Sequence, residues 1–310
     1  MPKVHVEKSV LINAPIDKVF KVVSDFHTWT TWSPWLVAEP DAKVTVREDG
    51  KFYSWEGDVV GAGEMTISNE VENTSVDIDL QFLKPWKSKA KVSFAMKEED
   101  GGVRVMWDMD SSLPFFMFWM KKMMVAFIGN DYQRGLTMLK DYVELDKVPA
   151  TLNIKGMEDF PGYTYIGIKQ DTVKIAAMGE AMESDYTTLM TYMMDGKEDQ
   201  MAGPAFSIYH KWDMVGGNAA YTACIPVTEV PTDLPAGVIT GSVPATKVHV
   251  MHQKGPYRHI GNVWSAQHMR LRNKKFKSNK SVDPMERYLN SPKNTEENDL
   301  ETEVLFAVKA

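Results

Sequence analysis

The chain has 310 residues, with 35 Lys and Arg against 42 Asp and Glu, so its formal net charge is −7. This length is typical of about two domains, and the 44% hydrophobic and 25% charged content excludes a mainly disordered chain. The acidic balance argues against a dedicated nucleic-acid-binding protein, which usually has a basic domain, so we expect no nucleic-acid partner.

Three features indicate the cellular location. The single cysteine, Cys224, cannot form an internal disulfide or a thiolate metal cluster, which favours a reducing compartment. Charged residues at the N-terminus occupy the place where a signal peptide has its apolar core. The apolar stretch at 114–129 is divided by Lys121 and Lys122, and neither part has the roughly 20 apolar residues of a spanning helix. We therefore expect a cytoplasmic protein without a membrane span.

Hydrophobic periodicity predicts a strand, a helix, six short strands and a long helix in the first half. Residues 3–12 alternate as a half-buried strand does, and Pro15 then opens a helix with apolar residues at helical spacing over 16–23. Short strand-like runs separated by turn signals fill 42–111. The helical period returns after Pro114, which predicts a long helix at the end of this half.

The order strand, helix, strand, strand occurs twice in the second half. Its first copy is predicted at residues 163–168, 175–194, 204–213 and 219–229, and its second at 247–252, 257–271, 285–289 and 301–308. This repetition predicts a pseudo-symmetric domain, although the two copies share no visible sequence identity. The predicted linker is Asp146–Ala150, and the fold class of the whole chain is α+β.

A set of motifs extends over nearly all of residues 1–147. They are Ile12-Asn13-Ala14-Pro15 with Val19-Phe20, Trp32-Ser33-Pro34-Trp35, residues 53–57 with 61–64, Trp107-Asp108-Met109, and residues 135–140. Together they resemble the SRPBCC superfamily, which includes START, Bet v 1 and polyketide cyclase-like domains. The resemblance implies a helix-grip domain over 1–147, in which a curved antiparallel sheet grips a long C-terminal helix around an apolar cavity.

A second set of motifs lies between residues 155 and 308. They are Gly203-Pro204-Ala205, Ile225-Pro226-Val227, residues 254–257, Trp264, Glu286-Arg287-Tyr288, and residues 301–304. They resemble the GyrI-like, or effector-binding, domain of many bacterial multidrug-responsive regulators. The resemblance implies a small-molecule-binding domain over 153–310, whose cleft between the two repeats takes apolar, often cationic, ligands near an acidic residue. Nothing upstream resembles a helix-turn-helix, so we expect no DNA-binding domain.

Glu286 is the leading candidate for that acidic residue. In an extended segment it shares a face with Tyr288, so an acid and a phenol would converge on the cleft. A partly buried carboxylate is costly to desolvate, so it would either raise its pKa or hold a cationic ligand. The alternative is an exposed glutamate paired with Arg287 or Lys280. Glu303 is a second acidic candidate, for which a solvated strand face is the alternative.

Aromatic and thioether side chains are further candidates in the second domain. Tyr257 and Trp264 would form aromatic walls, since aromatic faces attract cations by about 0.5–2 kcal/mol, with core packing as the alternative for Trp264. Tyr209 and Trp212 lie on opposite faces of one predicted strand, so at most one can line the cleft. Methionines of the 175–194 helix suit ligands of varied shape, although a methionine-tolerant core is the more common explanation.

The first half is rich in tryptophan. Trp32, Trp55 and Trp107 are candidates to line an apolar ligand cavity, with a bulky core under the helix as the alternative. Glu56 and Asp108 are candidate polar contacts, but no polar trio in this half suggests catalysis.

Histidine spacing argues against a metal site. His249 and His252 point to opposite faces of a strand, and His259 and His268 are about half a revolution apart on a helix. The sequence also lacks a zincin-type spacing, a Gly-rich phosphate loop and a nucleophile elbow. We expect neither a metal nor a cofactor.

These observations predict a sensor or sequestering protein that binds apolar, cationic or amphipathic small molecules. One alternative is a hydrolase of a reactive small molecule, with Glu286 as general acid or base and Tyr257 or Tyr288 polarising the substrate; the non-enzymatic function is favoured. A second alternative is an interaction protein that inhibits a partner such as gyrase, as the GyrI-like resemblance implies. The sequence itself indicates no particular protein partner.

Overall fold

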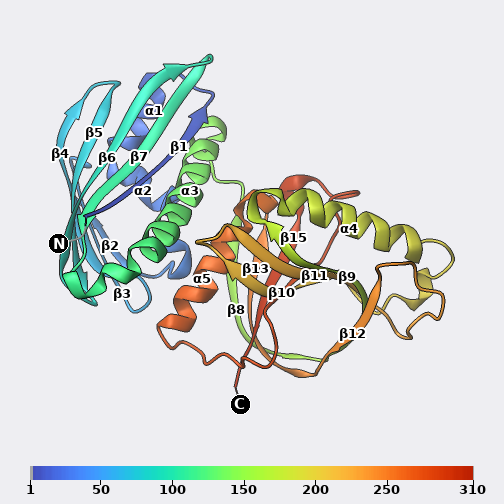
Figure 1. Ribbon diagram of the computed structural model, residues 1–310. Helices are drawn as coiled ribbons and strands as arrows, with labels where there is room; N and C mark the ends of the chain where they lie inside the picture. The colour runs from blue at the N-terminus through green and yellow to red at the C-terminus, as the bar shows by residue number, and fades with distance from the viewer. Residues whose placement is uncertain (1–2, 310) are drawn as a thin grey trace. The chain divides into compact units, whose positions relative to one another are not determined.

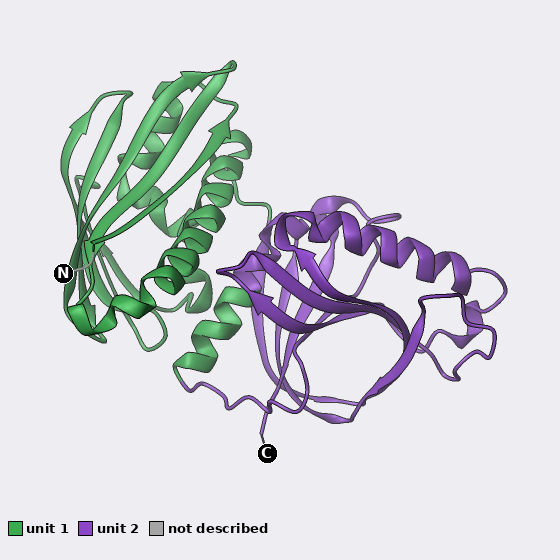
Figure 2. Cartoon of the chain, viewed as in Figure 1, with its two compact units in different colours: residues 1–149, 264–273 green, residues 150–263, 274–310 purple. Residues whose placement is uncertain are grey.

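The computed structural model describes residues 3–309, which form two compact units (Figure 1 and Figure 2). Unit 1 comprises the described residues up to Pro149 together with Trp264–Asn273. Unit 2 comprises Ala150–Val263 and the described residues from Lys274 onward. Each unit contains one antiparallel sheet with helices, so the predicted α+β fold class is confirmed.

The sheet of unit 1 has seven strands in the order β1-β7-β6-β5-β4-β3-β2. The strands are β1 (Lys3–Ile12), β2 (Lys43–Val46), β3 (Phe52–Gly57), β4 (Gly61–Val71), β5 (Ser75–Lys84), β6 (Ser88–Glu99) and β7 (Gly102–Ser112). β2 to β7 form a meander in which consecutive strands pair, and β1 closes on β7. This arrangement matches the six short strands that the turn signals predicted.

The helices of unit 1 cover one face of this sheet. They are α1 (Ile16–Val23), α2 (Phe26–Trp32), the short 3-10 helices η1 (Leu36–Ala38) and η2 (Phe115–Met120), and α3 (Lys121–Leu145). Figure 1 shows α3 running along the sheet beside β1, against which it packs. Its buried face carries Tyr132, Leu136, Leu139 and Val143, at helical spacing. Within residues 3–309, none of the helices has the length and apolar character needed to cross a bilayer.

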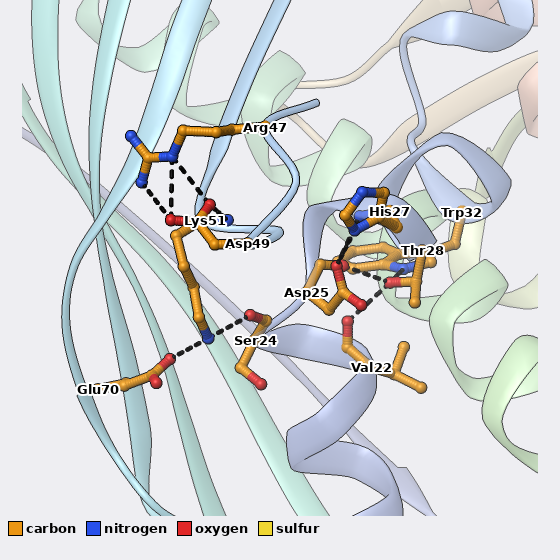
Figure 3. Close-up of polar contacts among 10 residues, drawn as sticks. All are labelled: Val22, Ser24, Asp25, His27, Thr28, Trp32, Arg47, Asp49, Lys51 and Glu70. Carbon is orange, nitrogen blue, oxygen red and sulfur yellow. Dashed lines mark hydrogen bonds and ion pairs between the residues drawn. The ribbon is translucent and has the colours of Figure 1, made fainter. Parts of the chain in front are cut away.

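The short helix α2 was not predicted, because its residues FHTWTTW are weak helix formers. Capping and tertiary contacts stabilise it instead. The Asp25 carboxylate is the N-cap and accepts hydrogen bonds from the His27 backbone amide at 2.9 Å and from the His27 imidazole at 2.8 Å (Figure 3). The indole of Trp32 donates to the Thr28 hydroxyl at 3.2 Å. These contacts hold Trp32 in the core of unit 1.

The sheet of unit 2 has eight strands in the order β12-β9-β11-β10-β14-β15-β13-β8. The strands are β8 (Thr151–Phe160), β9 (Tyr163–Lys174), β10 (Phe206–Asp213), β11 (Asn218–Pro226), β12 (Ile239–Val243), β13 (Thr246–Lys254), β14 (Met285–Tyr288) and β15 (Glu301–Ala307). The helical segments that follow β8 are η3 (Ile175–Ala177), α4 (Met178–Met193), η4 (Glu198–Gln200), η5 (Tyr257–His259), α5 (Ile260–Arg272) and η6 (Glu297–Asp299). Only the first residues of α5, up to Val263, belong to unit 2, and the rest of this helix belongs to unit 1. Two edge strands, β8 and β12, were not predicted.

The strand order of unit 2 reveals its internal symmetry. The first repeat contributes β9-β11-β10 and the second contributes β14-β15-β13, so the second half of the order mirrors the first. The unpredicted strands β12 and β8 extend the two ends equivalently. The repeats therefore meet at the central pair β10–β14, which we call the seam.

Candidate functional site

The candidate site lies at the seam of unit 2. In the β10–β14 register, Phe206 faces Arg287, Ser207 faces Glu286, and Ile208 faces Met285. Glu286 and Ser207 are therefore cross-strand neighbours, one from each repeat, on the same face of the sheet. Both are buried, with Glu286 5% exposed.

Glu286 and Tyr288 point to the same side, as the period of two predicted. The Tyr288 hydroxyl donates a hydrogen bond of 2.8 Å to the Glu286 carboxylate. The same hydroxyl lies 3.1 Å from Ser207 Oγ, which in turn lies 2.8 Å from the hydroxyl of Tyr186 on α4. Tyr186 also donates to the Phe206 carbonyl at 2.7 Å. A network of hydroxyl groups thus leads from the carboxylate to helix α4.

Aromatic rings surround this network. The ring of Tyr288 makes edge-to-face contacts with Tyr186, at 5.7 Å between centroids, and with Tyr257, at 5.9 Å. Tyr209 on β10 is buried, and its hydroxyl donates to the sulfur of Met182 on α4 at 3.8 Å. We call Glu286 with the four tyrosines 186, 209, 257 and 288 the tyrosine cluster.

The tyrosines of this cluster remain neutral phenols at physiological pH. Burial, followed by the charge of Glu286, raises the pKa of Tyr288 and of Tyr209 well above the ordinary value. The same two causes raise the pKa of Tyr257 to about 12. Burial likewise raises the pKa of Tyr186. The cluster therefore combines one carboxyl group with hydroxyls that keep their protons and can donate hydrogen bonds.

The prediction that Tyr209 and Trp212 lie on opposite faces is wrong. His210 is an extra residue in β10, because Tyr209 pairs with Tyr221 while Lys211 pairs with Ala220. This bulge shifts the alternation by one residue. The rings of Tyr209 and Trp212 consequently contact each other at 5.7 Å, with Trp212 44% exposed. Trp212 thus reaches the tyrosine cluster from its solvent side.

Glu303 lies on the opposite face of the sheet from Glu286, because it is the cross-strand partner of Arg287. Its side chain is 1% exposed, which excludes the solvated strand face. It accepts a hydrogen bond from Lys155 at 2.6 Å and from Arg287 Nε at 2.8 Å, and it also pairs with the Arg287 terminal nitrogen. Burial alone would raise the pKa of Glu303, but the bonds from Lys155 and Arg287 outweigh it, so the pKa is lowered. Its contacts are those of a buried ion pair.

Trp264 has a different setting from Tyr257. Trp264 belongs to unit 1, and its ring stacks on the imidazole of His268 with the two centroids 6.2 Å apart. Burial and nearby Arg272 lower the pKa of that histidine.

The predicted aromatic candidates of unit 1 form a packed cluster. The ring of Trp107 stacks on the rings of Tyr132 and Phe94, with centroids 3.9 Å and 4.9 Å apart. Trp32 makes an edge-to-face contact with Trp107, with centroids 6.1 Å apart. A Cβ atom on Gly135 would lie 2.7 Å from the Trp107 ring, so glycine allows α3 to approach this closely. Trp55 is partly buried, stacks on Tyr53 at 5.8 Å and donates to the Val60 carbonyl at 3.2 Å.

A depression of about 340 Å³ in unit 1 lies among polar side chains rather than among these indoles. It is lined by Ser68, Asp77, Ile78, Lys91, Val92, Ser93, Asp108 and Asp110. At its border, ligand atoms of His5, Asp108 and Asp110 lie within 4.8 Å of one another, a group that could hold a metal ion. Neither the spacing of the histidines nor a zincin-type motif reveals this group, because His5 lies more than 100 residues before the two aspartates. The alternation of Asp108 and Asp110, which puts both on one face of β7, is the signal that could have found it.

Comparisons with known families cover most of the chain. The protein-family model described as "Polyketide cyclase / dehydrase and lipid transport" matches residues 3–144. The model described as "GyrI-like small molecule binding domain" matches residues 157–309. Both families predicted from the motifs are therefore confirmed. No curated protein matches the chain.

The solved structures that match the chain share little sequence with it. A cryo-EM complex of EcmrR with DNA is 14% identical over 61% of this chain and 68% of that one, with a TM-score of 0.41. The crystal structure of the EcmrR C-terminal domain is 16% identical over 52% and 98%, with a TM-score of 0.39. The solution structure of the Aha1 dimer from Colwellia psychrerythraea is 17% identical over 46% and 98%, with a TM-score of 0.35.

Proposed function

Because the chain joins a domain of the polyketide cyclase, dehydrase and lipid transport family to a GyrI-like small-molecule-binding domain, we propose that it binds an apolar molecule carrying a positive charge at the tyrosine cluster. The observation that supports this proposal is the buried Glu286 carboxylate among the phenols of Tyr186, Tyr209, Tyr257 and Tyr288. The protein would act as a sensor or a sequestering protein in the cytoplasm.

The chemistry of the cluster fits a lipophilic or amphipathic cation. Aromatic faces attract a cation by about 0.5–2 kcal/mol and also remove the apolar part of the ligand from water. A carboxylate at low exposure interacts more strongly with a cation than one in bulk water, because the surrounding dielectric constant is lower. The Met182 sulfur at the Tyr209 hydroxyl adds a flexible side chain that can adapt to ligands of varied shape.

The other predicted site residues have supporting parts in this proposal. Trp212 would extend the aromatic wall of the tyrosine cluster toward solvent. Glu303 would stabilise the opposite face of the sheet. In unit 1, an apolar ligand would enter between the rings of Trp32, Trp55 and Trp107, and this requires the packed cluster to open.

Replacing Glu286 with glutamine should weaken the binding of lipophilic cations by about 10- to 100-fold, which corresponds to about 1.4–2.7 kcal/mol. The amide keeps the size of the side chain and can still accept from Tyr288, so the loss reports the negative charge. Isothermal titration of wild type and Glu286→Gln with tetraphenylphosphonium measures it. Triphenylphosphine oxide, a neutral molecule with similar rings, should bind both proteins equally.

The matched control is Glu301→Gln, since Glu301 is 42% exposed and bonds to His252 at 3.1 Å. It removes the same charge from unit 2 and should leave the affinity for the cation within about twofold of wild type. Equal affinities of wild type and Glu286→Gln for tetraphenylphosphonium would exclude Glu286 from ligand recognition.

Hydrolysis of a reactive small molecule is the second candidate, favoured by the 2.8 Å hydrogen bond between Tyr288 and Glu286. A carboxyl group in contact with a phenol can exchange a proton with substrate while the phenol polarises it. If this function holds, an epoxide or activated ester that binds wild type should be turned over, and Glu286→Gln should lower that rate by about 10²- to 10⁴-fold with binding retained. Bound probes that are not turned over, or equal rates in the two proteins, would argue against it.

A further inference from the structure

The segment that joins the sheet of unit 1 to its long helix is apolar on two sides. Its inner side packs on the core through Leu113, Met117, Met124, Val125 and Ile128. Its outer side exposes Phe115 (76%), Phe116 (75%), Phe118 (60%), Trp119 (67%) and Phe127 (51%). A helical segment that is apolar all round is normally covered on both sides. The exposed outer side of this segment is therefore a candidate surface for binding a partner.

A second exposed apolar group lies at the same end of the sheet. The β5–β6 connection exposes Phe82, Leu83 and Trp86, the last at 68%. Phe82 pairs with Ser88 across this connection, and the Ser111 hydroxyl at the end of β7 donates to the Lys89 carbonyl at 3.2 Å. Figure 1 shows the ends of these strands on the side where β1 begins and α3 starts. The two groups thus belong to one surface.

Lysines accompany both aromatic groups. The connection carries Lys84, Lys87 and Lys89, and the helical segment carries Lys121 and Lys122, all of them exposed. No Asp or Glu occurs within residues 80–97 or 111–130, although the whole chain has a net charge of −7. Among residues 3–309, Lys84 pairs with Glu56 on β3, whereas the other four of these lysines have no ion-pair partner. The ionisable residues of these two segments are therefore all basic.

We propose that this lysine–aromatic surface docks unit 1 on an anionic phospholipid bilayer. Tryptophan and phenylalanine side chains insert at the boundary between headgroups and acyl chains, where both apolar area and ring polarity are accommodated. Lysines beside them are attracted to anionic headgroups. The aromatic side chains and lysines lie on two neighbouring connections at one end of the sheet, so both can reach a flat surface together.

The charge distribution favours this occupant over a second copy of the chain. A symmetric dimer through this surface would bring each set of lysines against its own equivalent. The two segments contain no acidic residue that could neutralise them. An anionic bilayer supplies both the apolar environment and the opposite charge.

The test is flotation of the full chain with vesicles of pure phosphatidylcholine and with vesicles that also contain phosphatidylglycerol. Wild type should float with the anionic vesicles and stay in solution with the neutral ones. Two double variants, Phe116→Ser with Trp119→Ser and Lys121→Glu with Lys122→Glu, should each lower the partition coefficient by at least about tenfold. In wild type, brominated acyl chains should quench the fluorescence of Trp119, as shown by comparison with Trp119→Phe.

The matched control is Lys280→Glu with Lys293→Glu, which makes the same charge change at exposed positions of unit 2 and should float like wild type. Thermal unfolding of every variant checks that a lost interaction is not lost folding. The proposal is overturned if wild type does not float with anionic vesicles, or if the surface variants float as well as wild type. It is also overturned if wild type dimerises in solution and only the surface variants become monomeric, because the surface would then join two copies.

Discussion

Replacing Trp107 with alanine is expected to destabilise unit 1 by about 3–5 kcal/mol, the range for removing a large buried aromatic side chain. Trp107 is 1% exposed and stacks between Tyr132 of α3 and Phe94 of β6. Its removal leaves a cavity and also breaks the ring contacts that join the long helix to the sheet. In calorimetry of the full chain, the unfolding transition of unit 1 should shift downward by roughly 10 °C.

Two variants separate this effect from a general effect of losing an indole. Trp107→Phe keeps an aromatic ring in the stack and should recover part of the lost stability. Trp86→Ala removes a tryptophan that is 68% exposed and should change the free energy of unfolding by no more than about 0.5 kcal/mol. A Trp107→Ala protein with wild-type stability would mean that the indole occupies a space that solvent or ligand can fill equally well.

Replacing Glu303 with alanine should destabilise unit 2 by about 3 kcal/mol, the lower end of the range for breaking a buried ion pair. The loss arises because Arg287 keeps its charge without its carboxylate, in a position where the Arg287 side chain is only 18% exposed. Lys155 is 36% exposed and can turn to water more easily, which limits the effect. Denaturant unfolding of wild type and variant at pH 7 measures the difference.

Lowering the pH should reduce the difference in the free energy of unfolding between wild type and a variant that lacks the Glu303 charge. The folded-state pKa of Glu303 is lowered, so the ion pair adds full stability above the unfolded pKa of about 4.3 and loses it as the pH falls through the folded value. The gap between wild type and Glu303→Gln should therefore narrow below about pH 4 and stay constant above about pH 6. Glu301→Gln, on the same strand but exposed, should cost less than about 1 kcal/mol. A pH-independent gap would show that packing, rather than charge, accounts for the loss.

Periodicity alone predicted most of the architecture, since it reports which face of each element is buried. The alternation over residues 3–12 corresponds to β1 in full, and the repeated strand-helix-strand-strand order corresponds to the mirrored strand order of unit 2. The shared face of Glu286 and Tyr288 followed from the same argument, and their hydrogen bond agrees with it.

Irregular backbone explains what periodicity missed. The bulge at His210 reverses the faces of the residues after it, which is why Trp212 was placed wrongly. In β8 the apolar residues Leu152 and Ile154 are followed at the alternate position by Gly156, which has a φ of 87° where the pairing register with β13 shifts. β12 is a short, exposed edge strand that contains Gly241, so it has little apolar pattern.

Partners from distant parts of the chain could not be predicted either. Glu303 was singled out as an acidic candidate from its strand position, but its partner Lys155 lies in the unpredicted strand β8, 148 residues earlier. Tyr186 on α4 was not considered, because its place beside Tyr288 depends on how the helix packs on the seam. Pairings of this kind come from tertiary packing, which a single sequence does not display.

The mirrored strands of unit 2 carry unlike residues at their meeting point. The two-fold relation exchanges the position of Ser207 with that of Glu286, so one repeat offers a small neutral hydroxyl where the other offers an acid. A ligand lying across this axis would therefore meet a different chemical group at each of its ends. A molecule with one cationic end would then have a single preferred orientation, and a symmetric dication would leave one of its charges without a matching acid.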